Sequence, residues 1–437
     1  MIAHENAFDA VVIGGGAAGL FAAAQLGRMG LCCAVAEKNG ITGKKLLITG
    51  KGRCNVTNNC GADEVLKNVP TNAKFLFSAV TGFPPQQVIA YFEALGVPLK
   101  TERGNRVFPV SDQARDIADA LTADVKRHGG RIVRGAALEI LAENGAVYGV
   151  RTETDTLFSR NIIVATGGIS YPRTGSTGDG YRFAQALGHT IIAPTASLVP
   201  LVLYGKEAAE LMGLSLKNVT LSVFRHEKTS ENAPLSENAP AGKRKAVFTE
   251  QGELLFTHYG VSGPLVLSAS AHMKPDKFRY TLEIDLKPAL TEQQLDARIL
   301  RDFAEIPNRD FANSLGRLLP ATLIPVIVAR SGIAPETKVN AVTRAQRTQL
   351  VALLKHISFA VKGFRPADEA VITSGGVNVR EIDPKTMASK LTGGLYFAGE
   401  VIDVDAYTGG FNLQIAFSTG YAAARSIAQK LELQRKV

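Results

Sequence analysis

The stretch that decides the fold is DAVVIGGGAAGLFAAAQL, residues 9–26. It opens with a short apolar run, which is typical of a buried strand, and it closes with residues that favour a helix. Between them Gly14, Gly16 and Gly19 follow the G-x-G-x-x-G spacing. In this pattern the first glycine permits a tight turn, the second lets the backbone approach a pyrophosphate, and the third lets the helix pack on the strand. The stretch therefore predicts a dinucleotide-binding turn, in which N–H groups of the first helical turn face the phosphates.

An acidic residue ends the next apolar run. Residues 31–36 predict a second strand, and Glu37 follows it, 18 residues beyond Gly19. A carboxylate at about this spacing accepts hydrogen bonds from the hydroxyls of an adenosine ribose. It favours a free 2′-hydroxyl and disfavours a 2′-phosphate. We therefore expect the pocket to take FAD or NAD rather than NADP.

Distant glycine segments favour FAD over NAD. The sequence IVATGG at 163–168 contains an apolar strand, and so does GLYFAGE at 394–400, which leads into GGFNLQ at 409–414. A long cofactor with a ribityl chain and a tricyclic ring needs close backbone approach at several places. The last segment runs into a helix, whose positive N-terminus would stabilise an anionic reduced flavin ring. The alternative is that these segments are ordinary tight turns between strands and helices.

The composition is typical of a folded, basic chain. Its 437 residues, 46% of them hydrophobic and 20% charged, predict two or three globular domains. The N-terminus does not resemble a signal peptide, no apolar run has transmembrane length, and four cysteines do not make a secreted disulfide framework. We therefore expect a cytoplasmic protein without a membrane partner or a visible obligate protein partner. The formal charge of +9 indicates either contact with nucleic acid or a solvated basic surface.

Local patterns predict two further elements of the first domain. Helical spacing over 115–128 indicates an amphipathic helix, with Ser111 or Asp112 as its N-cap. The segment that follows alternates apolar and polar residues and turns at 143–145, which predicts a hairpin.

The middle of the chain has a different character. Residues 199–223 are strand-like, and residues 290–356 are mostly helical in pattern. Strand character returns at 370–377, before a C-terminal helix that begins near Asn412. The first domain is therefore predicted to be split by an insertion. Loop 226–245, which contains SENAP twice, is expected to be an exposed, mobile part of it.

Five sequence blocks resemble those of one known family. They are GKKL at 43–46, TGKGRCNVTN at 49–58, THYGVSGP at 257–264, TSGGV at 373–377 and GLYFAGEVIDVD at 394–405. Together they resemble the YhiN-like flavoproteins, a family that includes aminoacetone oxidases, BaiN-type bile-acid reductases and RdsA-type ribosomal RNA dihydrouridine synthases. The resemblance spans nearly the whole chain.

The resemblance implies an α/β protein with a split Rossmann-like FAD-binding domain, an inserted β-barrel-like subdomain and a small helical subdomain. We expect these parts at 1–193 with 363–437, at 194–287 with 348–362, and at 288–347. The resemblance also implies the contacts with the cofactor. At the pyrophosphate these are Gly14, Gly16, Ala17, Ala18 and Gly19, at the ribose Glu37 with Lys38, and at the adenine Val133. Lys45, Arg53 and Asn55 are implied along the cofactor, and the phosphate, ribityl and flavin end is implied to meet Thr166, Gly167, Gly168, Gly399, Glu400, Asn412 and Leu413.

Candidate catalytic residues are fewer. Reduction of a uracil double bond needs a hydride at one carbon and a proton at its neighbour, and a cysteine can supply that proton. Cys54 is the candidate, because it lies in the glycine-rich loop beside Arg53. The alternative is a small buried thiol that only packs. Cys32 and Cys33 are expected to be structural residues of a core strand.

Other side chains near the glycine segments are candidates for the substrate side. His258 faces the flavin or is a structural histidine, and Asp403 and Asp405 need be no more than caps. Tyr171, Arg173 and Tyr407 could line the substrate. No metal-ligand spacing is present, so no metal site is expected. A second G-x-G-x-x-G is also absent, so NADH or NADPH, as a transient electron donor, would have to visit the substrate cleft.

Three functions follow as hypotheses. The first is an NAD(P)H-driven, FAD-dependent reductase that forms dihydrouridine in 23S ribosomal RNA, reached as a precursor or an unfolded segment with the base turned out. The second is a small-molecule flavin oxidase or ene-reductase, acting on an amine such as aminoacetone or on a steroid-like acid. The third is an FAD-binding, RNA-associated protein without catalysis of its own.

Overall fold

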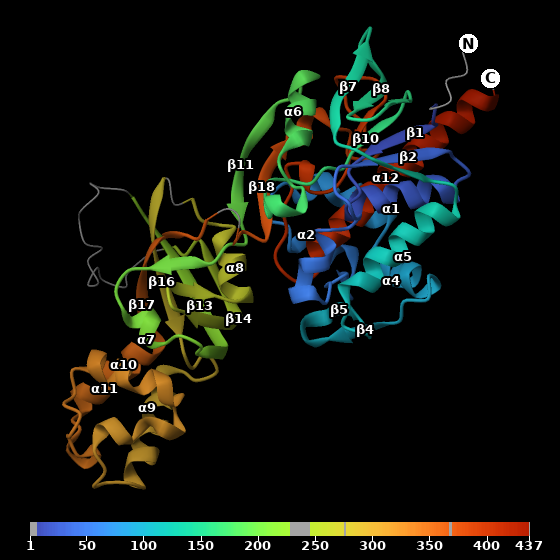
Figure 1. Ribbon diagram of the computed structural model, residues 1–437. Coiled ribbons are helices and arrows are strands. Elements are labelled where there is room, and N and C mark those ends of the chain that lie inside the picture. The colour runs from blue at the N-terminus through green and yellow to red at the C-terminus, as the bar shows by residue number, and fades with distance from the viewer. Residues whose placement is uncertain (1–6, 228–244, 275–276, 367–368, 437) are drawn as a thin grey trace. The chain divides into compact units, whose positions relative to one another are not determined.

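The structure is a computed structural model that describes residues 7–227, 245–274, 277–366 and 369–436. The chain forms two compact units (Figure 1). One unit combines Met1–Ser197 with Ala367–Val437, and the other is Leu198–Pro366. The first domain is thus built from both ends of the chain, as predicted.

A parallel five-stranded sheet forms the centre of the first unit (Figure 1). Its strand order is β19 (Leu395–Phe397), β10 (Ile162–Val164), β1 (Ala10–Ile13), β2 (Cys33–Glu37) and β6 (Arg131–Arg134). Every residue of β1, β2, β10 and β19 is buried, as expected for a parallel sheet covered on both faces. The carboxyl end of the central strand β1 therefore lies beside those of β2, the next strand in the chain, and β10, which comes from a distant part of it.

Three long helices pack in this unit, and they are α1 (Ala17–Arg28), α5 (Ala114–Arg127) and α12 (Phe411–Lys436). Helix α1 contacts both of the others, and Figure 1 shows α12 beside it. Phe21 of α1 meets Phe83, Tyr91 and Phe417 with ring centroids 4.9 to 5.1 Å apart. Because burial of one such ring stabilises a fold by about 1.5–3 kcal/mol, this cluster ties the C-terminal helix to the N-terminal one.

Smaller elements complete the first unit. They are β3 (Thr57–Asn58), β4 (Leu99–Glu102), β5 (Arg106–Pro109), β7 (Ala137–Glu143), β8 (Ala146–Thr152), β9 (Thr156–Phe158), β11 (Ile191–Ser197), β18 (Ile372–Val377), α2 (Ala62–Lys67), α3 (Phe77–Gly82), α4 (Pro85–Ala94) and α6 (Asp179–Ala186). Strands β7 and β8 form the predicted hairpin, which turns through Asn144 and Gly145. Both turn residues have positive φ, as tight hairpin turns require.

The start of α5 differs from the prediction. The helix itself is confirmed, but its N-cap is Gln113 rather than Ser111 or Asp112. The Ser111 hydroxyl accepts a hydrogen bond from the Gln113 backbone N–H (3.2 Å), and the Asp112 carboxylate binds Arg53 and Lys100. Asp112 is therefore held by cations that are distant in sequence, which a local capping pattern does not reveal.

The second unit contains a closed six-stranded barrel. Its strand order is β12 (Leu201–Leu203), β15 (Gly260–Ser262), β14 (Phe248–Thr257), β13 (Ser215–Glu227), β16 (Phe278–Asp285) and β17 (Ile357–Phe364), with β17 pairing back to β12. Closure satisfies both edges of the sheet. The predicted barrel is confirmed, but the strand character expected over 199–223 is interrupted by the short helix α7 (Glu207–Glu210). Helix α8 (Pro264–Ser270) follows β15.

Helices α9 (Glu292–Ala304), α10 (Ile324–Ser331) and α11 (Arg344–Lys355) confirm the predicted helical segment. Helices α9 and α11 begin with capping boxes, in which Thr291 and Thr343 accept hydrogen bonds from the N–H groups of Gln294 and Gln346. Buried side chains of these helices and of the barrel belong to one hydrophobic cluster. The predicted barrel and helical parts therefore form one compact unit. Of the predicted loop 226–245, residues 228–244 lie outside the described residues.

A buried carboxylate joins α1, α4 and α5. Asp124 is 0% exposed and accepts hydrogen bonds from Arg28 Nε (2.8 Å) and Nη2 (2.9 Å) and from the Tyr91 hydroxyl (2.7 Å). Burial alone would raise the pKa of Asp124, but the hydrogen bonds from Arg28 and Tyr91 outweigh it and hold the pKa below its usual value. The carboxylate therefore stabilises the fold above its unfolded-state pKa of about 4, and this contribution is lost as the pH falls through the lower folded-state pKa.

Asp124→Asn is expected to lower the free energy of unfolding by about 2 kcal/mol near neutral pH, because Arg28 and Tyr91 lose hydrogen bonds to a charged, buried acceptor. The matched control is Asp119→Asn, an exposed position on the same helix, with an expected change within about 0.5 kcal/mol. Denaturant unfolding followed by circular dichroism measures both. Equal stabilities of the two variants, or an undiminished acid sensitivity of Asp124→Asn, would contradict this role.

Candidate cofactor site

The glycine turn lies where β1 meets α1. Gly14 has φ +104°, and a Cβ there would lie 2.6 Å from the Ala165 carbonyl oxygen, so no side chain fits. A Cβ on Gly16 would meet no atom within 4 Å. Gly16 is also the N-cap of α1, with no capping hydrogen bond from a side chain and no acidic residue in the first turn. The structure thus leaves the positive helix end, at Ala17 and beyond, facing open space that suits a pyrophosphate.

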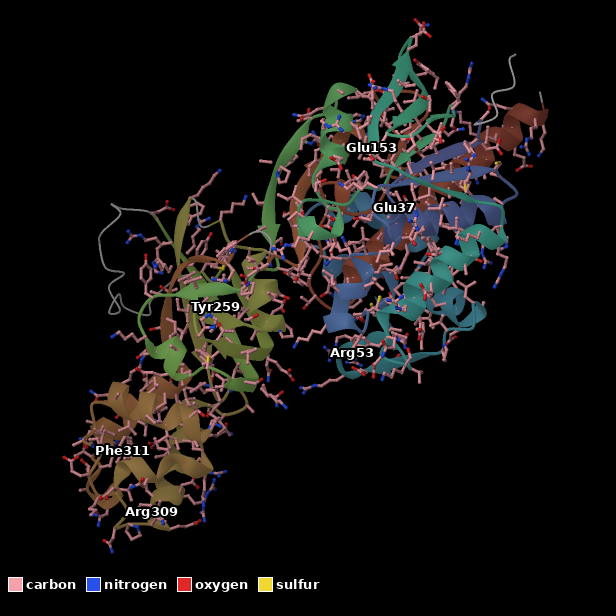
Figure 2. The ribbon with its side chains drawn as sticks, viewed as in Figure 1. Glu37, Arg53, Glu153, Tyr259, Arg309 and Phe311 are labelled. Carbon is pink, nitrogen blue, oxygen red and sulfur yellow. The ribbon has the colours of Figure 1, made fainter. Side chains whose placement is uncertain are left out.

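Glu37 connects the glycine turn to the end of β2 (Figure 2). Its Oε2 accepts a hydrogen bond from the Gly15 backbone N–H (2.7 Å), and its Oε1 accepts from the backbone and side chain of Asn39 (2.7 Å each). The side chain is buried and held from two sides. Because each carboxylate oxygen has two lone pairs, Glu37 can accept further hydrogen bonds from ribose hydroxyls.

Two other predicted adenosine contacts lie near this point. Val133 of β6 pairs with Ala36 of β2, so it stands one strand away from Glu37 and is buried. Lys38 extends elsewhere, because its Nζ donates to Asp179 Oδ2 (2.6 Å) on α6. The structure therefore groups Val133 with Glu37, whereas the charge of Lys38 is matched by Asp179.

Lys45 and Glu400 form the polar centre of the site. Lys45 Nζ donates to Glu400 Oε2 (2.6 Å) and to Ser170 Oγ (2.6 Å). The Ser170 hydroxyl and the Thr373 backbone N–H both donate to Glu400 Oε1 (2.9 Å each). Burial would raise the pKa of Glu400, but the Lys45 charge and these hydrogen bonds hold the pKa below its usual value. The network brings four distant segments together around one ionised carboxylate.

Asn55 and Arg53 lie in the loop that follows η1 (Leu46–Gly52). Asn55 Oδ1 is buried and has no hydrogen-bond partner in the described structure. Since an unsatisfied buried acceptor is costly, this atom points to a donor that a bound ligand would supply. Arg53, which Figure 2 labels, instead binds Glu102 and Asp112. Its guanidinium stacks on Phe108, 4.2 Å from the ring centroid.

Two of the segments expected at the flavin end lie close to α1 and to Glu400. Gly399 begins η11 (Gly399–Val401), and a Cβ there would lie 2.8 Å from the Ala18 Cβ. The segment Thr166–Gly168 follows β10, and a Cβ on Gly168 would lie 3.1 Å from Glu400 Oε1. Asn412, at the start of α12, turns its side chain back onto the Ala406 backbone (2.7 and 3.0 Å), with Leu413 half-buried beside it.

The two aspartates expected as caps have other partners. Asp405 is buried and accepts hydrogen bonds from Ser197 (3.1 Å) and Ser374 (3.3 Å). Asp403 is also buried and accepts one from Asn72 (3.0 Å). Burial raises the pKa of Asp403, and the charge of Asp405 adds to the effect.

Two contributors to this buried region were missed from the sequence. One is Ser170, and the other is Tyr181, whose hydroxyl is buried without a hydrogen-bond partner in the described structure. Burial raises the pKa of the Tyr181 phenol, with smaller contributions from the charges of Glu400 and Asp403. A serine after the TGG turn offered a weak signal, but nothing in the sequence around Tyr181 distinguishes it from a core residue.

The cysteines differ from one another. Cys33 is buried in β2 as expected, whereas Cys32 precedes the strand and is exposed, so its predicted place in the core was wrong. Cys54 is 0% exposed and has φ +59°. Burial raises the pKa of the Cys54 thiol to about 12, despite a hydrogen bond with Thr49 that lowers it. A thiol enclosed by protein on all sides favours the packing alternative over proton transfer.

The remaining candidates are distributed over both units. Tyr171 is half-buried with φ +51°, and Arg173 is exposed. The Tyr407 backbone N–H donates to the Asn68 carbonyl oxygen (2.9 Å). His258 belongs to the second unit, where its ring packs against Tyr259.

The described residues contain no group of three or more His, Cys, Asp or Glu side chains that could hold a metal ion. No helix in the described part of the chain is both long and apolar enough to cross a membrane.

The residues present fit FAD. Open space lies at Gly16 before an uncapped helix end, an acceptor for ribose hydroxyls lies at Glu37, and a buried acceptor without a partner lies at Asn55. Lys45 adds a positive charge to this set of groups, and Glu400 adds a negative one. The chemistry of this donor and acceptor set matches a diphosphate, a ribose and a polar ring edge.

Comparisons with known proteins agree with this geometry. A sequence profile described as "HI0933-like protein Rossmann domain" matches residues 8–426. A Haemophilus influenzae "Ribosomal RNA dihydrouridine synthase" is 31% identical over 431 residues, covering 96% of this chain and 98% of that protein. A Clostridium scindens "3-dehydro-bile acid delta(4,6)-reductase" is 27% identical over 424 residues, with coverage of 96% and 98%. A solved 3-ketosteroid delta1-dehydrogenase from Sterolibacterium denitrificans shares the fold, with a TM-score of 0.52 at 15% identity over 97% of this chain and 100% of that one.

Gly16→Val is expected to give a folded but colourless protein, because the side chain would enter the open space before α1 where the pyrophosphate is expected. The matched control is Gly61→Val, since Gly61 is also a helix N-cap with extended φ and ψ and open space around its Cβ. The ratio of visible flavin absorbance to protein absorbance measures cofactor content. A Gly16→Val protein as yellow as the Gly61→Val control would place the pyrophosphate elsewhere.

Proposed function

The chain belongs to the HI0933-like Rossmann-domain family, whose members are FAD-dependent oxidoreductases, and on this premise we propose that it forms dihydrouridine in 23S ribosomal RNA. The observation that carries the proposal is the 31% identity to the Haemophilus influenzae protein over nearly the full length of both chains. The glycine turn, Glu37 and the Lys45–Glu400 network support FAD as the resident cofactor. NADH or NADPH is proposed as the electron donor.

The reaction balances as a two-electron reduction. The C5=C6 bond of uracil is reduced when a hydride joins one carbon and a proton joins the other, while the nicotinamide donor is oxidised. When bound, FAD would supply the hydride chemistry that links the donor to the substrate. The residues of this chain would orient the cofactor: the N-terminus of α1 would hold the diphosphate, Glu37 the ribose, and Lys45 with Glu400 the polar part beyond.

A second function is favoured by a specific observation. The Clostridium scindens relative is named as a reductase of a 3-dehydro-bile acid and is 27% identical over 96% of this chain. The substrate in that name and uracil both contain a carbon–carbon double bond conjugated to a carbonyl group. The same hydride and proton transfers therefore reduce either compound. A small-molecule ene-reductase is thus the alternative, and the substrate must be tested directly.

Deletion of the gene in the organism that encodes it is expected to remove one dihydrouridine from 23S ribosomal RNA. Mass spectrometry of digested RNA measures the loss, and the wild-type gene restores the nucleoside whereas the Gly16→Val gene does not. An unchanged dihydrouridine content in the deletion strain would contradict the proposal. Reduction of a steroid enone by the purified protein and NAD(P)H would then support the alternative.

Cys54→Ala is expected to retain dihydrouridine formation within a few-fold, because the thiol is fully buried and a substrate cannot reach it. Loss of one small buried group instead lowers stability by roughly 1 kcal/mol. Single-turnover reduction of RNA and a thermal melt measure the two effects separately. A loss of activity of a hundredfold or more, at unchanged flavin content, would establish Cys54 as the proton donor.

A further inference from the structure

Aromatic and cationic residues lie along strand β12 in the second unit. They are Tyr204, His258, Tyr259 and Arg365, which we call the Tyr259 platform (Figure 2 labels Tyr259). The Arg365 guanidinium lies 4.5 Å from the centroid of the Tyr259 ring. The His258 and Tyr259 rings meet edge to face, with centroids 4.9 Å apart and planes at 79°. Tyr204 is 59% exposed, so its ring is accessible to a ligand from solvent.

Backbone hydrogen bonds hold the platform in place. The Leu203 N–H donates to the Tyr259 carbonyl oxygen (3.1 Å), so the end of β12 and the β14–β15 turn lie side by side. The Arg365 N–H donates to the Pro200 carbonyl oxygen (3.0 Å) at the other end of β12. The backbone that carries the aromatic rings therefore belongs to a closed barrel. Because this backbone is already ordered, it loses little conformational entropy when a ligand stacks on the rings.

Positive charge accompanies the rings. Lys206 and Lys362 are exposed, the first shortly after Tyr204 and the second on β17, which pairs with β12. Residues 198–366 hold 22 Lys and Arg against 16 Asp and Glu, whereas the longer first unit holds 27 against 24. The inserted unit therefore carries most of the net positive charge of the chain.

From these observations we propose that the Tyr259 platform binds a single-stranded segment of RNA, with bases stacked on Tyr204 and Tyr259 and phosphates near Lys206, Lys362 and Arg365. Proteins recognise single-stranded RNA by stacking its splayed bases on aromatic rings and guanidinium planes beside basic side chains. The inference rests on the proposed function, because an enzyme that reduces a base in RNA must hold flanking nucleotides in single-stranded form.

The test uses the full-length, flavin-loaded protein and a fluorescently labelled single-stranded ribosomal RNA oligonucleotide, with binding followed by anisotropy. Tyr204→Ala is expected to raise Kd about tenfold, the effect of losing one stacked base. Tyr259→Leu, which keeps apolar bulk at a half-buried site, should do the same. The matched control is Tyr148→Ala, since Tyr148 is 41% exposed on β8 of the first unit, and it should leave Kd within twofold.

Salt dependence separates stacking from charge. Lys362→Gln is expected to reduce the slope of log K against log salt by about 0.7, the effect of one phosphate contact with a single strand, whereas Tyr204→Ala should leave the slope unchanged. A duplex of the same sequence should compete poorly, and equal competition would overturn the single-strand assignment.

The outcomes also separate this inference from the proposed function. If wild-type protein forms dihydrouridine but Tyr204→Ala and Tyr259→Leu bind RNA like the wild type, the platform is overturned and the proposed function stands. If the wild-type protein neither binds RNA nor affects dihydrouridine, the proposed function and the inference that rests on it both fail.

Discussion

The first unit depends on how closely three distant chain segments approach the first turn of α1. A Cβ on Gly399 would lie 2.8 Å from the Ala18 side chain, and one on Gly420 would lie 2.8 Å from the Ala18 carbonyl oxygen. A Cβ on Gly14 would meet the backbone after β10 in the same way. Close packing of backbone on backbone fixes the position of the helix end, while the space in front of Gly16 stays open. The anion site therefore depends on close packing at these glycines, where a side chain would not fit.

Local sequence patterns were sufficient to predict much of this arrangement. The run into Gly14–Gly19, the acid at Glu37 and the hairpin at 143–145 each depend on neighbours in the sequence, and each prediction of local structure is confirmed. The return of strand character at 370–377 predicted the split domain, and the resemblance of distant blocks to one family implied the barrel. Short stretches of sequence are enough to predict these features, without knowledge of the rest of the fold.

Partners that are distant in sequence were not predictable in this way. Asp112 was expected to cap α5 but binds Arg53, and Lys38 meets Asp179 on another helix. Glu400 was expected at the cofactor, but the ion pair with Lys45, 355 residues away in the chain, depends on tertiary structure. Closure of the barrel between β12 and β17 was likewise not predictable from local sequence, because strands so far apart in the chain leave no local signal of their pairing.

The central claim is that the open space before α1 holds the diphosphate of FAD, and a structure of the flavin-loaded protein tests it most directly. The account predicts pyrophosphate oxygens within about 3 Å of the backbone nitrogens at the start of α1, and ribose hydroxyls donating to Glu37. A diphosphate bound by other residues, with the first turn of α1 left to solvent, would contradict it.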